Sequence, residues 1–479
     1  MMRTLVLLHR WLGVSFCLLF AMWFSTGIVM HFVPFPSLSE TGRFDGLLPI
    51  DTTQVLRGPA EAVRGSAIPD AARVRLLQRS DGPVYIVTGA SGLRAVHGGD
   101  LTDATVTSEA LALSIAQAAA RGQGFDPSQA TVAGFADYDQ WSVPNGFDRH
   151  RPLYRVALHD EHGTELYVSS VTGEIVLDTA WRQRAWNYAG SVTHWIYPTV
   201  LRKSQARWDV TVWWLSLIAL IAAMTGSALG LIRMTAKAGR IASPFRGWHW
   251  WHHILGLVCM TFVLSWIFSG WLSMDHGRLF ATGKLTAAEA AALPATPRWP
   301  ELATPIGQPM SPPAREIEWF AFDGKFYRRD RTGLGVQTLT AIDRGTGIPA
   351  APRAFLSVAE IGGLIGRLAQ NCSGPIPVMA GDNYAMAASL PSAPVYRLVC
   401  GEVWFHVDGA SGAVLERLDR SRRAYRWFYG ALHTLDVPVL VAHPLLRSAL
   451  VVILCGGGLA FSLTGVVIGW RRLRRQVIG

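Results

Sequence analysis

The sequence has few charged residues and few cysteines for its length. Only 16% of its 479 residues are Asp, Glu, Lys or Arg, whereas half are hydrophobic. Soluble domains carry about a quarter charged residues, so the composition argues against an ordinary soluble enzyme. The 19 Trp and 20 Phe exclude a disordered chain, because they supply far more apolar surface than a solvated chain carries.

Motifs for nucleotide-dependent and hydrolytic chemistry are also missing. There is no His-Glu-x-x-His sequence, no Walker loop and no Gly-x-Gly-x-x-Gly after a strand. No Ser, His and Asp follow the order expected around a nucleophile elbow. The chain therefore has no flavin or nicotinamide site that the sequence reveals, so a redox function would take its electrons from quinol or from another protein.

Four stretches are long and apolar enough to cross a bilayer, which takes about 20 helical residues. None has an Asp, Glu or Lys in its interior. The sequence thus predicts transmembrane helices at residues 5–32, 210–232, 254–274 and 446–470. Two long mixed-polar stretches at 33–208 and 277–445 separate them, with a short loop at 233–253 and a tail at 471–479. We expect a membrane protein with four transmembrane α-helices and two outer α+β domains.

The net charge of +10 is concentrated at one set of helix ends. Ten basic residues and no acidic residue flank these ends: Arg3, Arg10, Arg233, Lys237, Arg240, Arg246, Arg471, Arg472, Arg474 and Arg475. By the positive-inside rule these ends are cytoplasmic, so both termini lie inside and both large domains lie outside. The remaining basic and acidic residues cancel, which excludes nucleic acid as a partner and leaves the lipid bilayer.

The two halves of the sequence repeat. His9-Arg10-Trp11-Leu12-Gly13 aligns with His252-His253-Ile254-Leu255-Gly256 at an offset of 243. Residues 173–230 align with residues 412–469 at a constant offset of 239, which matches His194 to His433. Ordered matches of this length indicate a duplicated unit of helix, outer domain and helix. The four helices should then form a bundle with an approximate twofold axis along the membrane normal.

Each outer domain combines short alternating strands with one helix, predicted at residues 108–121 and 355–370. The turns Thr172-Gly173-Glu174 and Ser411-Gly412-Ala413 follow strands and resemble the end of a PepSY domain. The aromatic stretch, the His and the Thr-Gly-containing span after each turn resemble the PepSY-associated transmembrane family. Some members of that family are haem-containing ferric-siderophore reductases. The resemblance implies haem b, a bacterial inner membrane, periplasmic PepSY-like domains and a ferric siderophore as a candidate electron acceptor.

The repeat-matched histidines are the candidate haem ligands. A haem iron within a bundle needs imidazoles aimed at it and an apolar envelope around it. One matched pair lies at the cytoplasmic ends of the first and third spans, and the other lies on the outer side. We therefore expect two bis-imidazole sites, one on each face, which would carry electrons across the membrane: His9 with His252, and His194 with His433. The reserve ligands are His31, His249, His253 and His276.

Two alternatives stay open. Each histidine could instead cap a helix at the membrane interface, and the pairs Gly226/Gly230 and Gly465/Gly469 suit plain helix packing as well as a porphyrin slot. The protein could also be a non-enzymatic module whose PepSY-like domains bind or restrain an envelope protease or assist assembly. Cys372 and Cys400 share the second outer domain, where an oxidising compartment would let them pair.

Overall fold

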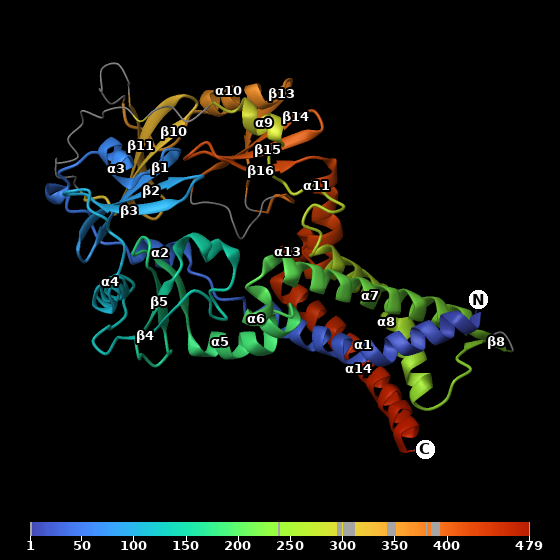
Figure 1. Cartoon of the computed structure of the whole chain (residues 1–479). Coiled ribbons are helices and arrows are strands. Elements are labelled where there is room, and N and C mark those ends of the chain that lie inside the picture. Colours follow the sequence, from blue (N-terminus) through green and yellow to red (C-terminus); the bar gives the residue numbers. More distant parts are fainter. Residues whose placement is uncertain are drawn as a thin grey trace. The chain divides into compact units, whose positions relative to one another are not determined.

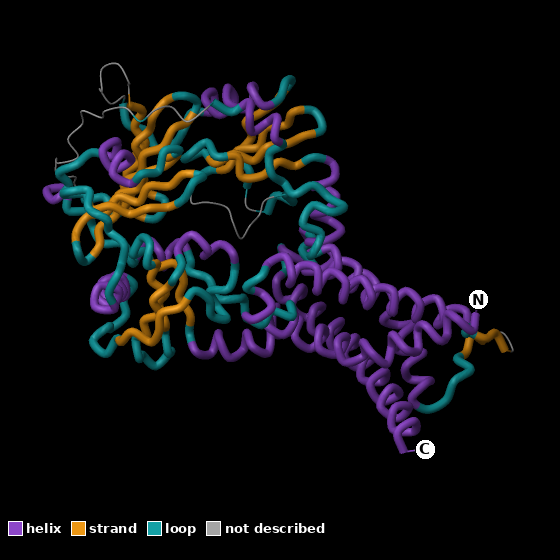
Figure 2. Tube along the Cα trace, viewed as in Figure 1, coloured by secondary structure: helices purple, strands orange, loops and turns teal. Residues whose placement is uncertain are grey.

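The computed structural model describes residues 2–237, 240–294, 299, 312–342, 351–379, 381–384 and 393–478. Two compact units divide the chain, and each combines segments from both halves of the sequence (Figure 1). The helical unit comprises residues 1–35, 183–282 and 421–479. The sheet unit comprises residues 36–182 and 283–420. Figure 2 shows the long helices in the first unit and nearly all strands in the second.

Four long helices form the helical unit, and all four are long and apolar enough to cross a membrane. They confirm the four predicted spans, and the third begins several residues earlier than predicted, at Trp248. In the bundle α1 lies against α7 and α14, and α8 lies against the same two helices. Both termini lie at the same end (Figure 1). The bounds are α1 Met2–Phe32, α7 Gln205–Ile232, α8 Trp248–Leu272 and α14 Pro444–Ile478.

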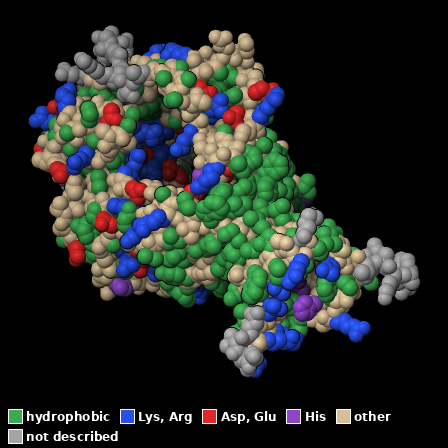
Figure 3. Space-filling view, turned by 45° about the vertical axis from the view of Figure 1, so that its right-hand side comes forward, with side chains coloured by type: hydrophobic (Ala, Val, Ile, Leu, Met, Phe, Trp, Pro, Cys, Tyr) green, Lys and Arg blue, Asp and Glu red, His purple; other side chains and the backbone are tan. Residues whose placement is uncertain are grey.

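An apolar core fills the space between these helices. Phe20 and Phe24 of α1 pack with Cys259 and Val263 of α8 and with Cys455 of α14. Hydrophobic side chains also cover the outer surface of the bundle (Figure 3). Helices that are apolar on all sides suit a bilayer, in which lipid covers the outside of the bundle. The protein is therefore a multi-pass membrane protein.

Short helices precede α7 and α14, and each series contains a π-helical segment. The first series is α5 Trp181–Asn187, η3 Tyr188–Val192 and α6 Thr199–Arg202. The second is α11 Arg420–Tyr425, η4 Arg426–Ala431, α12 Leu432–Thr434 and α13 Pro438–Val441. The π-helices are η3 and η4. Such segments are rare and occur often at functional sites. A small hairpin, β8 Thr235–Lys237 and β9 Arg240–Ala242, joins α7 to α8.

The sheet unit contains three antiparallel sheets. Six strands form the largest in the order β12-β11-β10-β1-β2-β3: β1 Ala71–Arg79, β2 Gly82–Gly89, β3 Leu93–His97, β10 Glu316–Phe322, β11 Lys325–Gly333 and β12 Val336–Ile342. The second sheet is β4 Thr131–Ala136, β5 Leu153–Ala157, β6 Glu165–Ser169 and β7 Ile175–Thr179. The third is β13 Cys372–Pro377, β14 Val395–Cys400, β15 Val403–Asp408 and β16 Val414–Leu418. Cys372 and Cys400 form a disulfide between β13 and β14.

A helix packs on each four-stranded sheet. Ser108 caps α4 (Glu109–Gly122), whose residues Ala112, Ile115 and Ala116 pack against Val156 of β5. On the third sheet a capping box at Ser357 starts α10 (Val358–Leu368), which buries its apolar face against β14 and β15. These two α+β units correspond to those that the sequence predicts. The remaining helices are α2 Glu40–Asp45, η1 Thr52–Gln54, α3 Pro59–Ser66, η2 Asn145–His150 and α9 Ala287–Ala292.

The six-stranded sheet joins the two halves of the sequence, whose mixed-polar stretches predict two separate domains. Strand β1 of the first half pairs with β10 of the second half. Arg75 lies opposite Glu318, and Leu77 lies opposite Glu316. The outer domains are therefore one compact unit, because a continuous hydrogen-bonded ladder crosses from one repeat to the other.

Glu316 is the most heavily shared charge at this junction. Its side chain is 3% exposed, and Arg43, Arg75 and Arg331 approach its oxygens to 3.0, 3.3 and 2.9 Å. Burial alone would raise the pKa of the Glu316 carboxyl, but the three guanidinium groups outweigh burial and hold the pKa well below its usual range. The carboxylate thus stabilises the fold at neutral pH, and this contribution is lost only as pH falls below the ordinary carboxyl range.

We predict that Glu316→Ala destabilises the sheet unit by about 3–5 kcal/mol, because it leaves three guanidinium groups facing one another without the buried carboxylate that they share. Thermal unfolding of the full-length protein in detergent, followed by circular dichroism, measures the loss. Glu161→Ala is the control, since the Glu161 side chain is 88% exposed. Equal melting temperatures for the two variants at neutral pH would contradict the assigned role of Glu316.

Candidate functional site

The four repeat-matched histidines lie in the helical unit as two facing pairs. His9 of α1 faces His252 of α8, with ring centroids 6.4 Å apart. His194, which follows η3, faces His433 of α12, and their ring centroids are also 6.4 Å apart. The structure thus brings together the same two pairs that the sequence repeat matches.

In the first pair, each ring uses its Nδ1 atom to contact a neighbouring helix. His252 Nδ1 lies 2.9 Å from the hydroxyl of Thr464 on α14. His9 Nδ1 lies 3.2 Å from the carbonyl oxygen of Ala222 on α7 and 3.5 Å from the Thr225 hydroxyl. Thr225 and Thr464 are equivalent positions of the repeat.

The second pair is held in the same way by α1 and α8. His194 Nδ1 lies 2.9 Å from the Thr26 hydroxyl, and His433 Nδ1 lies 3.2 Å from the Ser269 hydroxyl. Thr26 and Ser269 are again equivalent positions of the repeat. Desolvation lowers the pKa of His194 to about 3 and that of His433 to about 4, so both rings are neutral at neutral pH.

These contacts determine which ring nitrogen carries the proton. A carbonyl oxygen only accepts, so His9 Nδ1 must donate to Ala222. The hydroxyl groups of Thr464 and Thr26 already donate to carbonyl oxygens of their own helices, with Oγ1···O distances of 2.5 and 2.7 Å. The two hydroxyl oxygens can then accept a hydrogen bond from Nδ1–H of the histidine. The proton therefore lies on Nδ1, and the lone pair lies on Nε2. A neutral imidazole with an unprotonated Nε2 is the form that binds a metal ion.

A glycine next to each hydroxyl residue leaves room for the imidazole. A Cβ atom built on Gly226 would lie 2.6 Å from His9 Cε1, and one on Gly270 would lie 3.2 Å from His433 Cε1. At Gly465 and Gly27 the corresponding distances to His252 and His194 are 3.6 and 3.7 Å. Each histidine therefore rests against a cradle, by which we mean the hydroxyl residue and the following glycine: Thr225-Gly226, Thr464-Gly465, Thr26-Gly27 and Ser269-Gly270.

The two pairs lie near opposite ends of the bundle. On α1, Thr26 follows His9 by 17 residues, which corresponds to about 26 Å of helix. Helix α8 repeats this spacing between His252 and Ser269. The apolar core that contains Phe24 occupies the length between the two pairs.

The reserve ligands are used differently. Both ring nitrogens of His253 have partners, the Ser243 hydroxyl at 2.7 Å and the Gly230 carbonyl oxygen at 2.8 Å. His31 Nε2 lies 2.8 Å from the Ser448 hydroxyl. His276 Nδ1 lies 2.7 Å from Asp209, and His249 is exposed in the first turn of α8. His253 is therefore occupied by structural contacts.

The distance within each pair suits two imidazoles on opposite sides of one metal ion. A metal–imidazole bond is about 2 Å and a nitrogen lies about 1.2 Å from its ring centroid, which gives about 6.4 Å between the two centroids. Over the described ranges, no group of three or more His, Cys, Asp or Glu side chains could hold a metal ion. A metal ion held by such a pair would need its remaining ligands from a bound group such as a porphyrin.

Comparison with protein families identifies the chain. A family described as the PepSY-associated TM region matches residues 6–472. The chain belongs to this family. No curated protein matches it. The match covers nearly the whole of this PepSY-associated protein, so all four cradles and all four paired histidines lie within the family region.

The repeat in the sequence of this PepSY-associated protein predicts which histidines face each other, but it does not predict the residues that hold them. The repeat matches Gly226 to Gly465 and Gly27 to Gly270, and packing alone explains these glycines. A hydroxyl residue directly before each of the four glycines is the signal that could have been used. A Thr or Ser inside an apolar helix bonds its own backbone and can still accept one further hydrogen.

We predict that Gly226→Ala destabilises the helical unit of this PepSY-associated protein relative to Gly465→Ala by about 1–3 kcal/mol, the usual range for overpacking. Alanine favours a helix equally at both sites, so the comparison isolates the contact with His9 at 2.6 Å from the ordinary contact with His252 at 3.6 Å. Thermal unfolding of the two purified variants in detergent measures the difference. Identical melting temperatures would show that the first cradle is not tightly packed.

Proposed function

We propose that the helical unit binds two haem b groups and passes electrons across the membrane. His9 and His252 hold one haem, and His194 and His433 hold the other. The observation that carries this proposal is the facing of two imidazoles at 6.4 Å in both pairs, each held through Nδ1 by a neighbouring helix. A bis-imidazole haem supplies reversible one-electron transfer.

The residues of the chain orient the ligands and exclude water. Each Nδ1–H donates to a hydroxyl or carbonyl oxygen of a neighbouring helix, which fixes the tautomer and the rotation of the ring and increases the basicity of Nε2. Rings fixed in this way by a neighbouring helix need little reorganisation when a ligand binds them. The apolar core around Phe20, Phe24 and Val263 keeps the interior between the sites dry.

We propose that the bundle has an approximate twofold axis along the membrane normal. Two observations support it. The cradles of α7 and α14 hold the first pair, and the cradles of α1 and α8 hold the second, so equivalent positions play equivalent parts. Within the sheet unit, β1 of the first half likewise pairs antiparallel with β10 of the second half. An axis through a pair of like elements produces this pattern.

We infer that the membrane is a bacterial inner membrane, with both termini in the cytoplasm and the sheet unit in the periplasm. The ten basic residues at one set of helix ends support this orientation. The Cys372–Cys400 disulfide in the sheet unit supports it independently, because disulfides persist in oxidising compartments such as the periplasm.

We propose that quinol or a reduced protein partner supplies the electrons, and that a ferric complex in the periplasm accepts them. A quinol oxidised to quinone releases two electrons and two protons. The two electrons would reduce two ferric ions to ferrous ions. Reduction of a ferric siderophore in iron acquisition is the role that the family resemblance implies.

We predict that His9→Ala and His252→Ala each remove the same haem, because each breaks one bis-imidazole site. The double variant should lose no more haem than either single variant, and His194→Ala should spare this haem and remove the other. Pyridine haemochrome assay of the purified variants gives the haem content per chain. His443→Ala is the matched control, since His443 is exposed ahead of α14.

The result that would contradict the pairing is additivity. If the losses from His9→Ala and His252→Ala add in the double variant, the two residues belong to different sites. If every variant keeps its full haem content, the paired histidines are not ligands and His31, His249 and His276 become the candidates. Absence of haem from all preparations would favour a non-enzymatic PepSY module that restrains an envelope protease or assists assembly.

A second prediction follows from the basic helix ends. Alkaline phosphatase, which is active only outside the cytoplasm, should be active when fused after residue 130 or 340 and inactive when fused after residue 240. The positive-inside rule gives this orientation. Enzyme activity in cells, normalised to the amount of fusion protein, measures it. Activity of the fusion at 240 alone would invert the topology and move the first histidine pair to the outer face.

A further inference from the structure

A cavity of about 400 Å³ lies in the sheet unit, apart from the histidine pairs. Its walls include Arg73 and Arg75 of β1, Thr88 of β2, and Arg149 and His150 of η2. Among the described residues that line this cavity, three are arginines and none is acidic. Small-molecule sites in proteins have volumes of about 300–1,000 Å³.

The fold directs these cations to one place. Residues two apart on a strand point to the same face, so Arg73 and Arg75 lie side by side on β1. Thr88 is paired with Arg73 in the ladder and extends this face onto β2. On the other side, His150 Nδ1 lies 3.3 Å from the Ser169 hydroxyl, and that hydroxyl donates to the His150 carbonyl oxygen at 3.2 Å. These bonds hold η2 and therefore Arg149 at the cavity.

The acidic residues behind the cavity are shared among several cations. Arg75 donates to Glu174 at 2.6 and 2.9 Å, and Arg73 Nε lies 2.8 Å from Glu318. Glu318 also pairs with Arg329, and Glu316 is shared by three arginines. Arg149 is exposed and has no charged partner among the residues that the structure describes. The cavity wall therefore carries positive charge that the protein does not neutralise.

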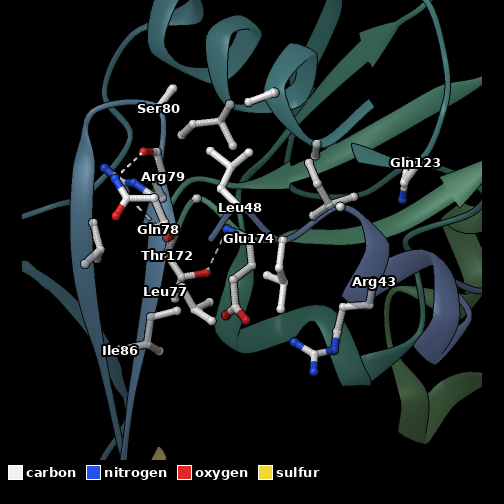
Figure 4. Close-up of a pocket in the computed structure, with 18 residues that line it drawn as sticks. Arg43, Leu48, Leu77, Gln78, Arg79, Ser80, Ile86, Gln123, Thr172 and Glu174 are labelled. Carbon is white, nitrogen blue, oxygen red and sulfur yellow. Dashed lines mark hydrogen bonds between the residues drawn. The ribbon is translucent and has the colours of Figure 1, made fainter. Parts of the chain in front are cut away.

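A second cavity nearby has a different character. It has a volume of about 50 Å³, which is room for a few water molecules, and most of its walls are apolar (Figure 4). Both of its arginines have carboxylate partners: Arg79 pairs with Asp81 and donates to the carbonyl oxygens of Ala104 and Thr172, and Arg43 pairs with Glu40 and Glu316. Of these two cavities, only the larger combines room for a small molecule with a guanidinium group that has no charged partner among the described residues.

We propose that the larger cavity binds a small anion that carries two or more carboxylate or phosphate groups. Guanidinium groups bind both kinds of oxyanion through two parallel N–H···O bonds. Arg149 and Arg73 are exposed enough to meet such a ligand, whereas Arg75 is fixed by Glu174 and contributes charge. The Thr88 hydroxyl offers a neutral hydrogen bond on the same face. This site does not depend on haem binding by the helical unit.

The test is isothermal titration of the full-length protein in detergent at low ionic strength with three probes. Citrate carries three carboxylates, pyrophosphate carries two phosphates, and sorbitol is an uncharged polyol of similar size. We expect saturable binding of at least one anion and none of sorbitol. Arg149→Gln should weaken that binding about tenfold, the effect of losing one charge-assisted pair of hydrogen bonds.

Arg94→Gln is the matched control. Arg94 is exposed on β3 next to Leu93, which lines the cavity, and its own side chain points to the opposite face of the sheet. The two variants lose the same charge within one sheet unit, so Arg94→Gln should leave the affinity within about twofold of the unaltered protein. Equal weakening by both variants, or no saturable binding of either anion, would overturn the proposal.

Discussion

The helical unit depends on how an imidazole is held inside an apolar bundle. A histidine ring carries a donor and an acceptor, and a ring buried without a partner for its donor loses a hydrogen bond that water would have made. Here a Thr or Ser of the neighbouring helix, or a backbone carbonyl, accepts from Nδ1–H. A glycine beside it lets the ring approach the helix backbone. The ring nitrogen that remains without a proton is Nε2. Its direction is fixed by the segment that carries the histidine and by the helix that contacts Nδ1.

Duplication turns this local arrangement into a pair of sites. Each repeat contributes one histidine to each pair, so neither repeat could form a bis-imidazole site by itself. The sheet unit has the same dependence on both repeats. Its central ladder places β1 beside β10, and Glu316 of the second repeat is held by Arg43 and Arg75 of the first. The two halves are therefore coupled in both units.

Part of this structure can be read from local sequence patterns. The four spans follow from apolar runs with no interior Asp, Glu or Lys, and α4 follows from Ser108 before an amphipathic stretch. The pairing of the histidines could be predicted because the two halves of the sequence align and match the histidines in pairs. Pairing of β1 with β10 could not, since residues 239 or more positions apart meet there and no local pattern encodes their register. The arginine cavity likewise depends on η2 reaching β1, which only the tertiary fold determines.

The proposal that the bundle holds two haem groups is tested most directly by the haem content and absorption spectrum of the unaltered full-length protein, purified in detergent from haem-replete cells. The account predicts two haem b groups per chain, with the Soret and α bands of six-coordinate low-spin haem that sharpen on reduction. A colourless preparation of folded protein would contradict it. In that case the facing imidazoles would be helix contacts only, and the electron-transfer function would fall with them.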